Sequence, residues 1–143
     1  MKISLKEVIE GIQDLVETSV PELKRALYTF DFSQDTQKNK DYPALFIVSN
    51  QNFTIGENVN TTPLLLVFCD VTGGRLNDID RDKEIKSDML QAASKLLDLM
   101  QVNGYIDGDI SVDAQPFSYG LNNALSGIDC IVPITIEKPC YEV

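Results

Sequence analysis

The stretch LLLVFCDVTGGRLNDIDRDKEIKSDMLQAASKLLDLM, residues 64–100, decides the fold class of this chain. It begins with a strand in which every position from 64 to 68 is Leu, Val or Phe. Such a run is typical of a strand whose two faces are both covered. We expect helices to cover one face, and a partner subunit is one candidate for the other.

A helix follows this strand after a loop rich in Gly and Asp. Gly73 and Gly74 permit backbone angles that other residues avoid, and Asp78 or Asp80 can cap the helix. Apolar residues then recur at three- and four-residue steps, which predicts one wide buried stripe. The stripe comprises Ile85, Met89, Ala92, Ala93, Leu96, Leu97 and Met100, with Leu90 and Leu99 on its borders.

An N-terminal helix is predicted ahead of this unit. Ser4 and Glu7 form the Ser-x-x-Glu pattern of a capping box, and Pro21 ends the segment. The face expected to be buried comprises Leu5, Val8, Ile9, Ile12, Leu15 and Val16. Residues 32–41 are too polar to form anything but a loop.

Four further strands flank the central unit. Residues 42–49 predict one strand, and residues 53–55 predict a short one that forms an antiparallel hairpin with residues 62–71. Residues 110–114 alternate apolar and polar like a strand with one wet face, and residues 116–123 look irregular.

The last strand spans residues 127–137, and Pro133 places it at a sheet edge or at a bulge because proline lacks the N–H donor. The predicted order is helix, three strands, helix, two strands. The chain reads as a single domain over residues 1–143, without repeats.

Composition excludes several functional classes. A net charge of -10, with scattered Lys and Arg, argues against a general nucleic-acid binder, since such proteins neutralise phosphates with basic residues. The longest apolar run, residues 64–69, is far shorter than the roughly 20 residues that cross a bilayer. The odd number of cysteines, with Cys69 and Cys130 inside apolar runs, indicates a reducing compartment. We expect a soluble protein that makes no membrane contact.

Metal and phosphate sites fit the sequence poorly. Asp78, Asp80 and Asp82 resemble the start of a calcium loop, but Lys83 and Met89 stand where that loop needs Gly and Glu. Helix capping is the better interpretation. The loop at residues 73–75 lacks the Lys-Ser/Thr of a phosphate-binding loop, and acidic residues open the helix that follows.

Catalytic groups are also hard to assemble. The chain has no histidine, the commonest general base. Asp70, Asp107, Asp109 and Asp113 could pair as carboxylates for hydrolysis, but Asp-Gly at 107–108 is expected in a turn anyway. Cys69 and Cys130 have apolar or acidic neighbours and read as buried structural thiols, while Cys140 near the C-terminus could be exposed without a role. We therefore predict no catalytic, cofactor-binding or metal-binding residues, and no enzymatic activity.

A family resemblance emerges from the order of these segments. The Leu/Val-rich strand ending in Asp70, the loop, and the helix segments 85–91 and 96–99 resemble the neck and tail-completion proteins of tailed bacteriophages, including tail terminators. Pro116-Phe117, followed by residues 124–128 and an apolar strand, is similar to the end of those proteins. Ile128 follows Gly127 where the family has an aromatic residue. The resemblance spans roughly residues 42–140.

This resemblance implies an α+β domain with both helices on one face of a mainly antiparallel sheet of about 4–5 strands. It further implies a non-enzymatic virion protein, made in the host bacterial cytoplasm, that forms a homo-oligomeric ring, a hexamer or larger. The ring joins the portal or connector to the tail and leaves a channel through which DNA passes only as cargo. Ring contacts in this family use sheet edges and hairpins, so residues 51–61 and 32–41 are the candidate contact segments.

Two functions from other classes stay open. A small cytoplasmic binding or adaptor module fits the same pattern, because a fold does not fix a function. A metal-dependent hydrolase would use Asp70, Asp80, Asp107 and Asp109.

Overall fold

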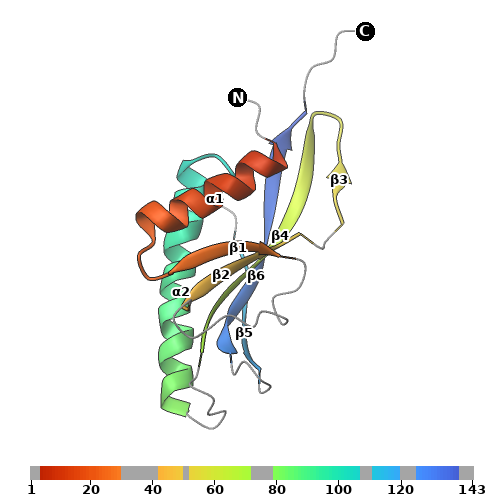
Figure 1. Ribbon diagram of the computed structural model, residues 1–143. Helices are drawn as coiled ribbons and strands as arrows, with labels where there is room; N and C mark the ends of the chain where they lie inside the picture. Colours follow the sequence, from red (N-terminus) through yellow and green to blue (C-terminus); the bar gives the residue numbers. More distant parts are fainter. Residues whose placement is uncertain are drawn as a thin grey trace.

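The computed structural model describes residues 4–29, 42–49, 52–71, 79–106, 111–119 and 125–138. Along the chain the elements are α1 (Leu5–Ser19), β1 (Arg25–Thr29), β2 (Ala44–Val48), β3 (Thr54–Ile55), β4 (Val59–Val71), α2 (Ile79–Val102), β5 (Ala114–Tyr119) and β6 (Leu125–Glu137). They form a six-stranded sheet in the order β1-β2-β4-β6-β5, with β3 added to β4 (Figure 1). Every pair is antiparallel except β1 with β2. The predicted α+β class and mainly antiparallel sheet are confirmed.

Both helices pack on the same face of the sheet. In α1, Ser4 Oγ accepts a hydrogen bond of 3.1 Å from the Glu7 N–H, so the predicted N-cap is confirmed. The helix ends at Ser19, shortly before Pro21. Its fully buried residues are Val8, Ile12 and Val16, while Leu5, Ile9 and Leu15 pack at the margin of the core.

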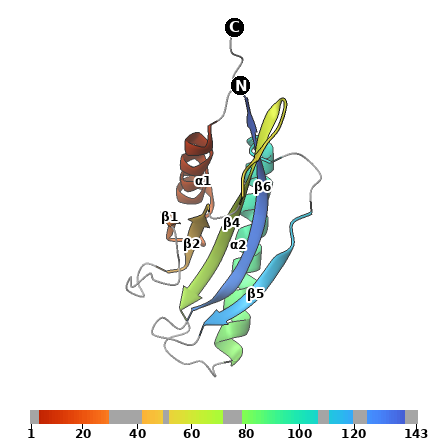
Figure 2. The same ribbon diagram turned by 90° about the vertical axis from the view of Figure 1, so that its right-hand side faces the viewer.

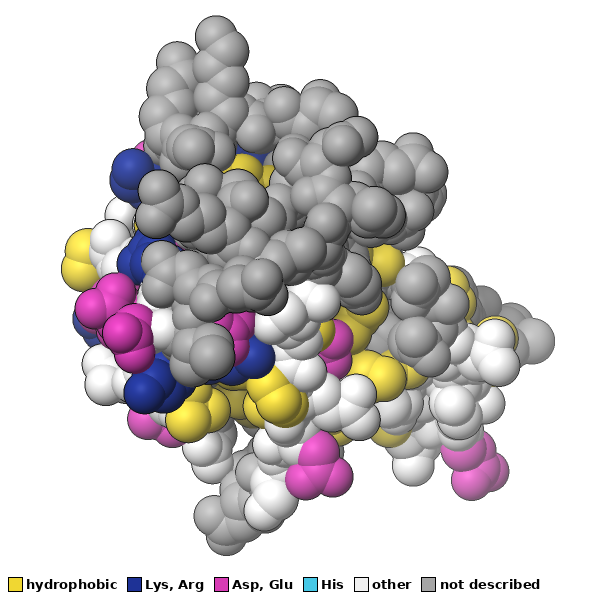
Figure 3. Space-filling model, turned by 90° about the horizontal axis from the view of Figure 1, so that it is seen from below, with side chains coloured by type: hydrophobic (Ala, Val, Ile, Leu, Met, Phe, Trp, Pro, Cys, Tyr) yellow, Lys and Arg dark blue, Asp and Glu magenta, His cyan; other side chains and the backbone are white. Residues whose placement is uncertain are grey.

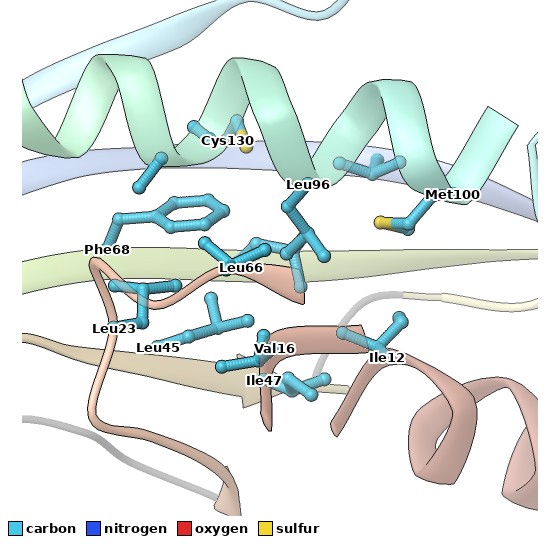
Figure 4. Packing of buried hydrophobic residues seen from close by; sticks show 14 of the residues in the cluster. Ile12, Val16, Leu23, Leu45, Ile47, Leu66, Phe68, Leu96, Met100 and Cys130 are labelled. Atoms are coloured by element: carbon cyan, nitrogen blue, oxygen red, sulfur yellow. The ribbon is translucent and has the colours of Figure 1, made fainter. Parts of the chain in front are cut away.

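The core lies between the two helices and the sheet, where side chains from α1, α2, β2, β4 and β6 meet. Figure 4 shows Leu96 and Met100 of α2 directed toward Leu66 of β4, with Cys130 of β6 and Ile12 of α1 nearby. The predicted α2 stripe is buried along its length, and Leu97 is partly buried. Each large side chain removed from water in this way contributes about 1.5 to 3 kcal/mol before entropy.

A second apolar cluster on the opposite face explains the continuous apolar run of β4. Leu64, Leu66 and Phe68 face the helices, whereas Val67 is fully buried in a cluster with Tyr42, Ala44, Phe46, Cys69 and Leu125. The Arg25 guanidinium lies 5.3 Å from the ring centroids of both Tyr42 and Phe46. Both faces of the central strand are therefore covered, and Val67 needs no partner subunit for its burial.

Two strands differ from expectation. β1 was not predicted, and it gives the sheet six strands where about 4–5 were expected. The strand predicted over residues 110–114 is wrong for 111–113, which lie outside the sheet, and Ile110 is not among the described residues. The prediction that residues 116–123 are irregular is wrong for residues 116–119, because these belong to β5. Pro116 is tolerated there because β5 is an edge strand whose outer side needs no donor.

The prediction that Pro133 lies at a sheet edge or a bulge holds only locally, because β6 as a whole lies between β4 and β5. Pro133 of β6 lies opposite Pro63 of β4. β5 pairs with β6 only as far as Cys130. At Pro133, the side of β6 that faces away from β4 therefore has no described strand beside it. On the other side of β4, Leu65 is the nearest residue to Pro63 that pairs with β2, and Thr61 is the nearest that pairs with β3. Pro63 itself pairs with neither of these strands. Both prolines thus occupy positions where a missing N–H breaks no described strand pair.

Candidate interaction surface

Asp70, one of the carboxylates weighed for catalysis, forms an ion pair that joins the sheet to α2. Its Oδ2 lies 2.9 Å from Arg81 Nη2, and its Oδ1 accepts a 2.8 Å hydrogen bond from the Val71 N–H. Arg81 also lies 3.6 Å from Glu84 on the same helix. Asp70 therefore anchors the start of α2 to the end of β4.

Asp82 makes a second anchor between α2 and the sheet. Its Oδ2 accepts a 2.7 Å hydrogen bond from Lys86, and its Oδ1 accepts bonds from Ser126 at 2.6 Å and Ser118 at 2.9 Å. The Lys86 bond, followed by the Ser126 bond, lowers the pKa of Asp82. Viewed from the end at which α2 begins, basic and acidic side chains lie next to one another on the surface (Figure 3). Sequence reasoning missed Ser118 and Ser126, because their contribution depends on strands that meet only in the fold.

The metal and hydrolase interpretations receive no support from the positions of the described aspartates. Asp80 is exposed and lies 3.7 Å from Lys83, and Met89 is buried in the core. Asp78, Asp107, Asp109 and the 73–75 loop lie outside the described residues. Within the ranges that are described, no group of three His, Cys, Asp or Glu side chains could hold a metal ion.

The two described cysteines are buried thiols, as predicted, and Cys69 Sγ donates to the Ala44 carbonyl at 3.8 Å. Burial, followed by the charge of Asp129, raises the pKa of the Cys130 thiol to about 12. A thiol with such a pKa stays protonated near neutral pH and is a poor nucleophile. Cys140 lies outside the described residues.

A β-ribbon that projects from the body is the most distinctive surface feature. It comprises β3, residues 59–61 of β4 and residues 135–137 of β6, and we call it the arm. Figures 1 and 2 show the arm extending past α1, with β3 and β4 in yellow and the end of β6 in blue. β2 pairs with β4 only from Leu65 onward, so the arm continues where the main sheet narrows.

Short contacts fix the turn at the tip of the arm. The Gly56 N–H donates to the Val59 carbonyl at 3.0 Å, and Lys138 Nζ donates to the Gly56 carbonyl at 2.9 Å. The Lys138 N–H also donates to the Asn58 carbonyl at 3.3 Å. A Cβ at position 56 would lie 2.5 Å from the Val59 oxygen, so glycine is required for this turn. The arm is therefore an ordered projection that holds its shape.

Apolar side chains are exposed along the arm. Ile55 is 79% exposed and the neighbouring Phe53 is 56% exposed, and Val59, which follows the turn, is also exposed. In addition, Asn60 Oδ1 is buried but meets no hydrogen-bond donor among the described residues. Exposed apolar groups gathered on one projection are typical of a surface that another protein covers.

The arm overlaps one of the two predicted contact segments. Residues 52–61 are described and belong to it or border it, whereas the other segment, residues 32–41, lies outside the described residues. The sequence indicated a polar hairpin and missed its apolar surface. The spaced residues Phe53, Ile55 and Val59 were the available signal.

Comparison with known proteins adds no family assignment: no family model matches the chain, and no curated protein matches it. Among the described helices, none is long and apolar enough to span a membrane.

Proposed function

We propose that this chain is a non-enzymatic structural protein of the head-to-tail junction in a tailed bacteriophage virion, of the tail-terminator or neck type. Copies of the chain form a ring, a hexamer or larger, that joins the portal or connector to the tail. DNA passes through its channel without specific contacts. The sequence resemblance supplies the hypothesis.

The arm is the observation that carries the proposal. An ordered ribbon with Ile55 79% exposed costs free energy in water unless another surface covers it. A second copy of the chain is the simplest source of such a surface, because repeating one contact around an axis closes a ring. Because the arm extends past α1, it can reach across the boundary to a neighbouring subunit (Figure 2).

The charge and the polar contacts agree with this role. A chain with a net charge of -10 repels a polyanion, so a channel that it lines lets DNA slide. Asp70 and Asp82 form ion pairs with Arg81 and Lys86, and these pairs supply a structural role for both carboxylates.

Light scattering coupled to size-exclusion chromatography tests the proposal. The chain should run as a ring at micromolar concentration, or should become one when the portal and tail proteins encoded beside it are added. A chain that stays monomeric and binds none of those proteins would refute the virion role. Binding to an unrelated cytoplasmic protein by a monomer would instead favour an adaptor module.

A further inference from the structure

The sheet face that carries no helix has an apolar surface beside the base of the arm. Alternate side chains of β4 and β6 point to opposite faces, and Leu64 and Val132 lie in the core under the helices. Leu65, Ile131 and Pro133 therefore point the other way, and in Figure 2 α2 lies behind these two strands. Cross-strand pairing joins the apolar residues of this face into one block, which we call the stripe: Pro63 with Pro133, and Leu65 with Ile131.

The stripe is open to solvent in the described part of the chain. Ile131 is 50% exposed and Pro133 is exposed, while Pro63 and Leu65 are partly buried. β5 pairs with β6 only as far as Cys130, so no described strand lies beside the outer edge of Ile131. The chain thus has two exposed apolar surfaces, the arm and the stripe.

Each of the two surfaces has an unmatched charge beside it. Asp129 lies next to the stripe on β6, is partly buried, and forms no hydrogen bond or ion pair with a described side chain. Burial raises the pKa of this carboxyl. At the arm, Lys138 Nζ donates to the neutral Gly56 carbonyl and meets no carboxylate among the described residues. Glu57 in the same turn is exposed to water. The arm and the stripe are therefore complementary in charge as well as apolar.

These surfaces cannot cover one another within a single chain. Ile55 of the arm pairs with Asn60, and Ile131 of the stripe pairs with Leu65 on the same strand. Five residues along a strand span about 17 Å. A second copy can bring the two together. A contact between two different surfaces of one chain, repeated from copy to copy, closes a ring when the rotation allows it.

We infer that the arm of one copy lies on the stripe of the next, with Ile55 against Ile131 and Lys138 beside Asp129. The occupant of the stripe is a second copy of this chain, because the arm supplies the apolar side chain and the cation that the stripe lacks. The inference rests on the proposed ring and names the contact that closes it.

Cross-linking between copies tests the contact. In a Cys140→Ser chain, whose Cys69 and Cys130 are buried, Ile55→Cys is combined with Ile131→Cys and treated with a short bis-maleimide after assembly, alone or with portal and tail proteins. We expect a ladder of linked chains on a denaturing gel, from dimer to complete ring. The matched control combines Ile55→Cys with Leu90→Cys on α2, where Leu90 is 53% exposed, and should give no ladder.

A double-mutant cycle tests the charge pair. Lys138→Gln keeps an N–H donor for the Gly56 carbonyl but removes the charge, and Asp129→Asn removes the opposite charge. Each should weaken assembly about fivefold, and the double variant should be no weaker than the singles. Thermal unfolding checks that each variant is folded.

The outcomes separate this contact from the proposed ring. Rings that give no ladder, or additive losses in the cycle, overturn the contact and leave the ring in place. A link from position 55 to a portal or tail protein in place of the ladder also overturns it. A chain that never assembles overturns the ring and the contact together.

Discussion

Replacing Gly127 with alanine should weaken the sheet at its centre. Gly127 lies in β6 opposite Cys69 of β4 and Phe117 of β5, so β-strands flank it on both sides. An added Cβ would lie 1.9 Å from the Phe68 carbonyl oxygen and 2.8 Å from Cys69 Cα. Both are backbone atoms of a strand that pairs with β6 over its whole length. The neighbouring strand must therefore move to admit one methyl group.

The size of the effect follows from that rigidity. Overpacking a core costs about 1 to 3 kcal/mol when side chains can yield, and here only backbone can yield. We expect a loss of at least about 3 kcal/mol in the free energy of unfolding. At roughly 3 to 4 °C per kcal/mol for a domain of this size, Tm should fall by about 10 °C.

Thermal and urea unfolding of Gly127→Ala beside Gly104→Ala provides the assay. Gly104 has a φ of +78° but no atom within 4 Å of an added Cβ, so its substitution costs only backbone strain, about 1 kcal/mol. The steric argument fails if Gly127→Ala unfolds at the same temperature as the wild type, or above Gly104→Ala.

Three further outcomes follow from local contacts. Ser4→Ala should lower the free energy of unfolding by about 0.5 to 2 kcal/mol, because the Glu7 N–H loses its hydrogen bond to the Ser4 hydroxyl. Urea unfolding measures this, and an unchanged midpoint would show that the cap contributes nothing. The lowered pKa of Asp82 means that its stabilisation is present above its unfolded pKa and disappears as pH falls through the lower folded value. Asp82→Asn should therefore lose less stability than the wild type on acidification below about pH 4, and equal losses would contradict this. In a Cys140→Ser chain, thiol reagents at pH 8 should label neither Cys69 nor Cys130 until the protein unfolds; rapid native labelling would show that burial is incomplete.

The sequence predicted those elements whose signals are local. The Ser4 cap, the α2 stripe and the hairpin of β3 with β4 each depend on residues close together in the chain, and each is present. The bounds of the hairpin were wrong, because β4 begins at Val59 and β3 pairs with residues 60–61, which lie outside the strand predicted at 62–71. β1 escaped prediction because its five residues form a strand through parallel pairing with β2, a long-range contact without a local pattern. β5 was placed too early because residues 116–123 were interpreted as irregular, although an edge strand accepts Pro116.

The candidate surfaces were predictable only in part. The hairpin at residues 51–61 was picked out as a contact segment by resemblance and by its length, but the exposure of Ile55 and Phe53 depends on the arm projecting beyond the body. Ser118 and Ser126 could not be predicted as partners of Asp82, since β5 and β6 bring them to α2 only in the fold.

The most direct test of the account is the assembly state of two matched variants, measured by light scattering and negative-stain electron microscopy. Ile55→Glu places a charge at the exposed arm, and Val102→Glu places the same charge on α2, where Val102 is 83% exposed. We predict rings with a central channel for the wild type and Val102→Glu, formed alone or with portal or tail proteins, and about tenfold weaker assembly for Ile55→Glu. Identical assembly of all three proteins, or a chain that never assembles, would contradict the account.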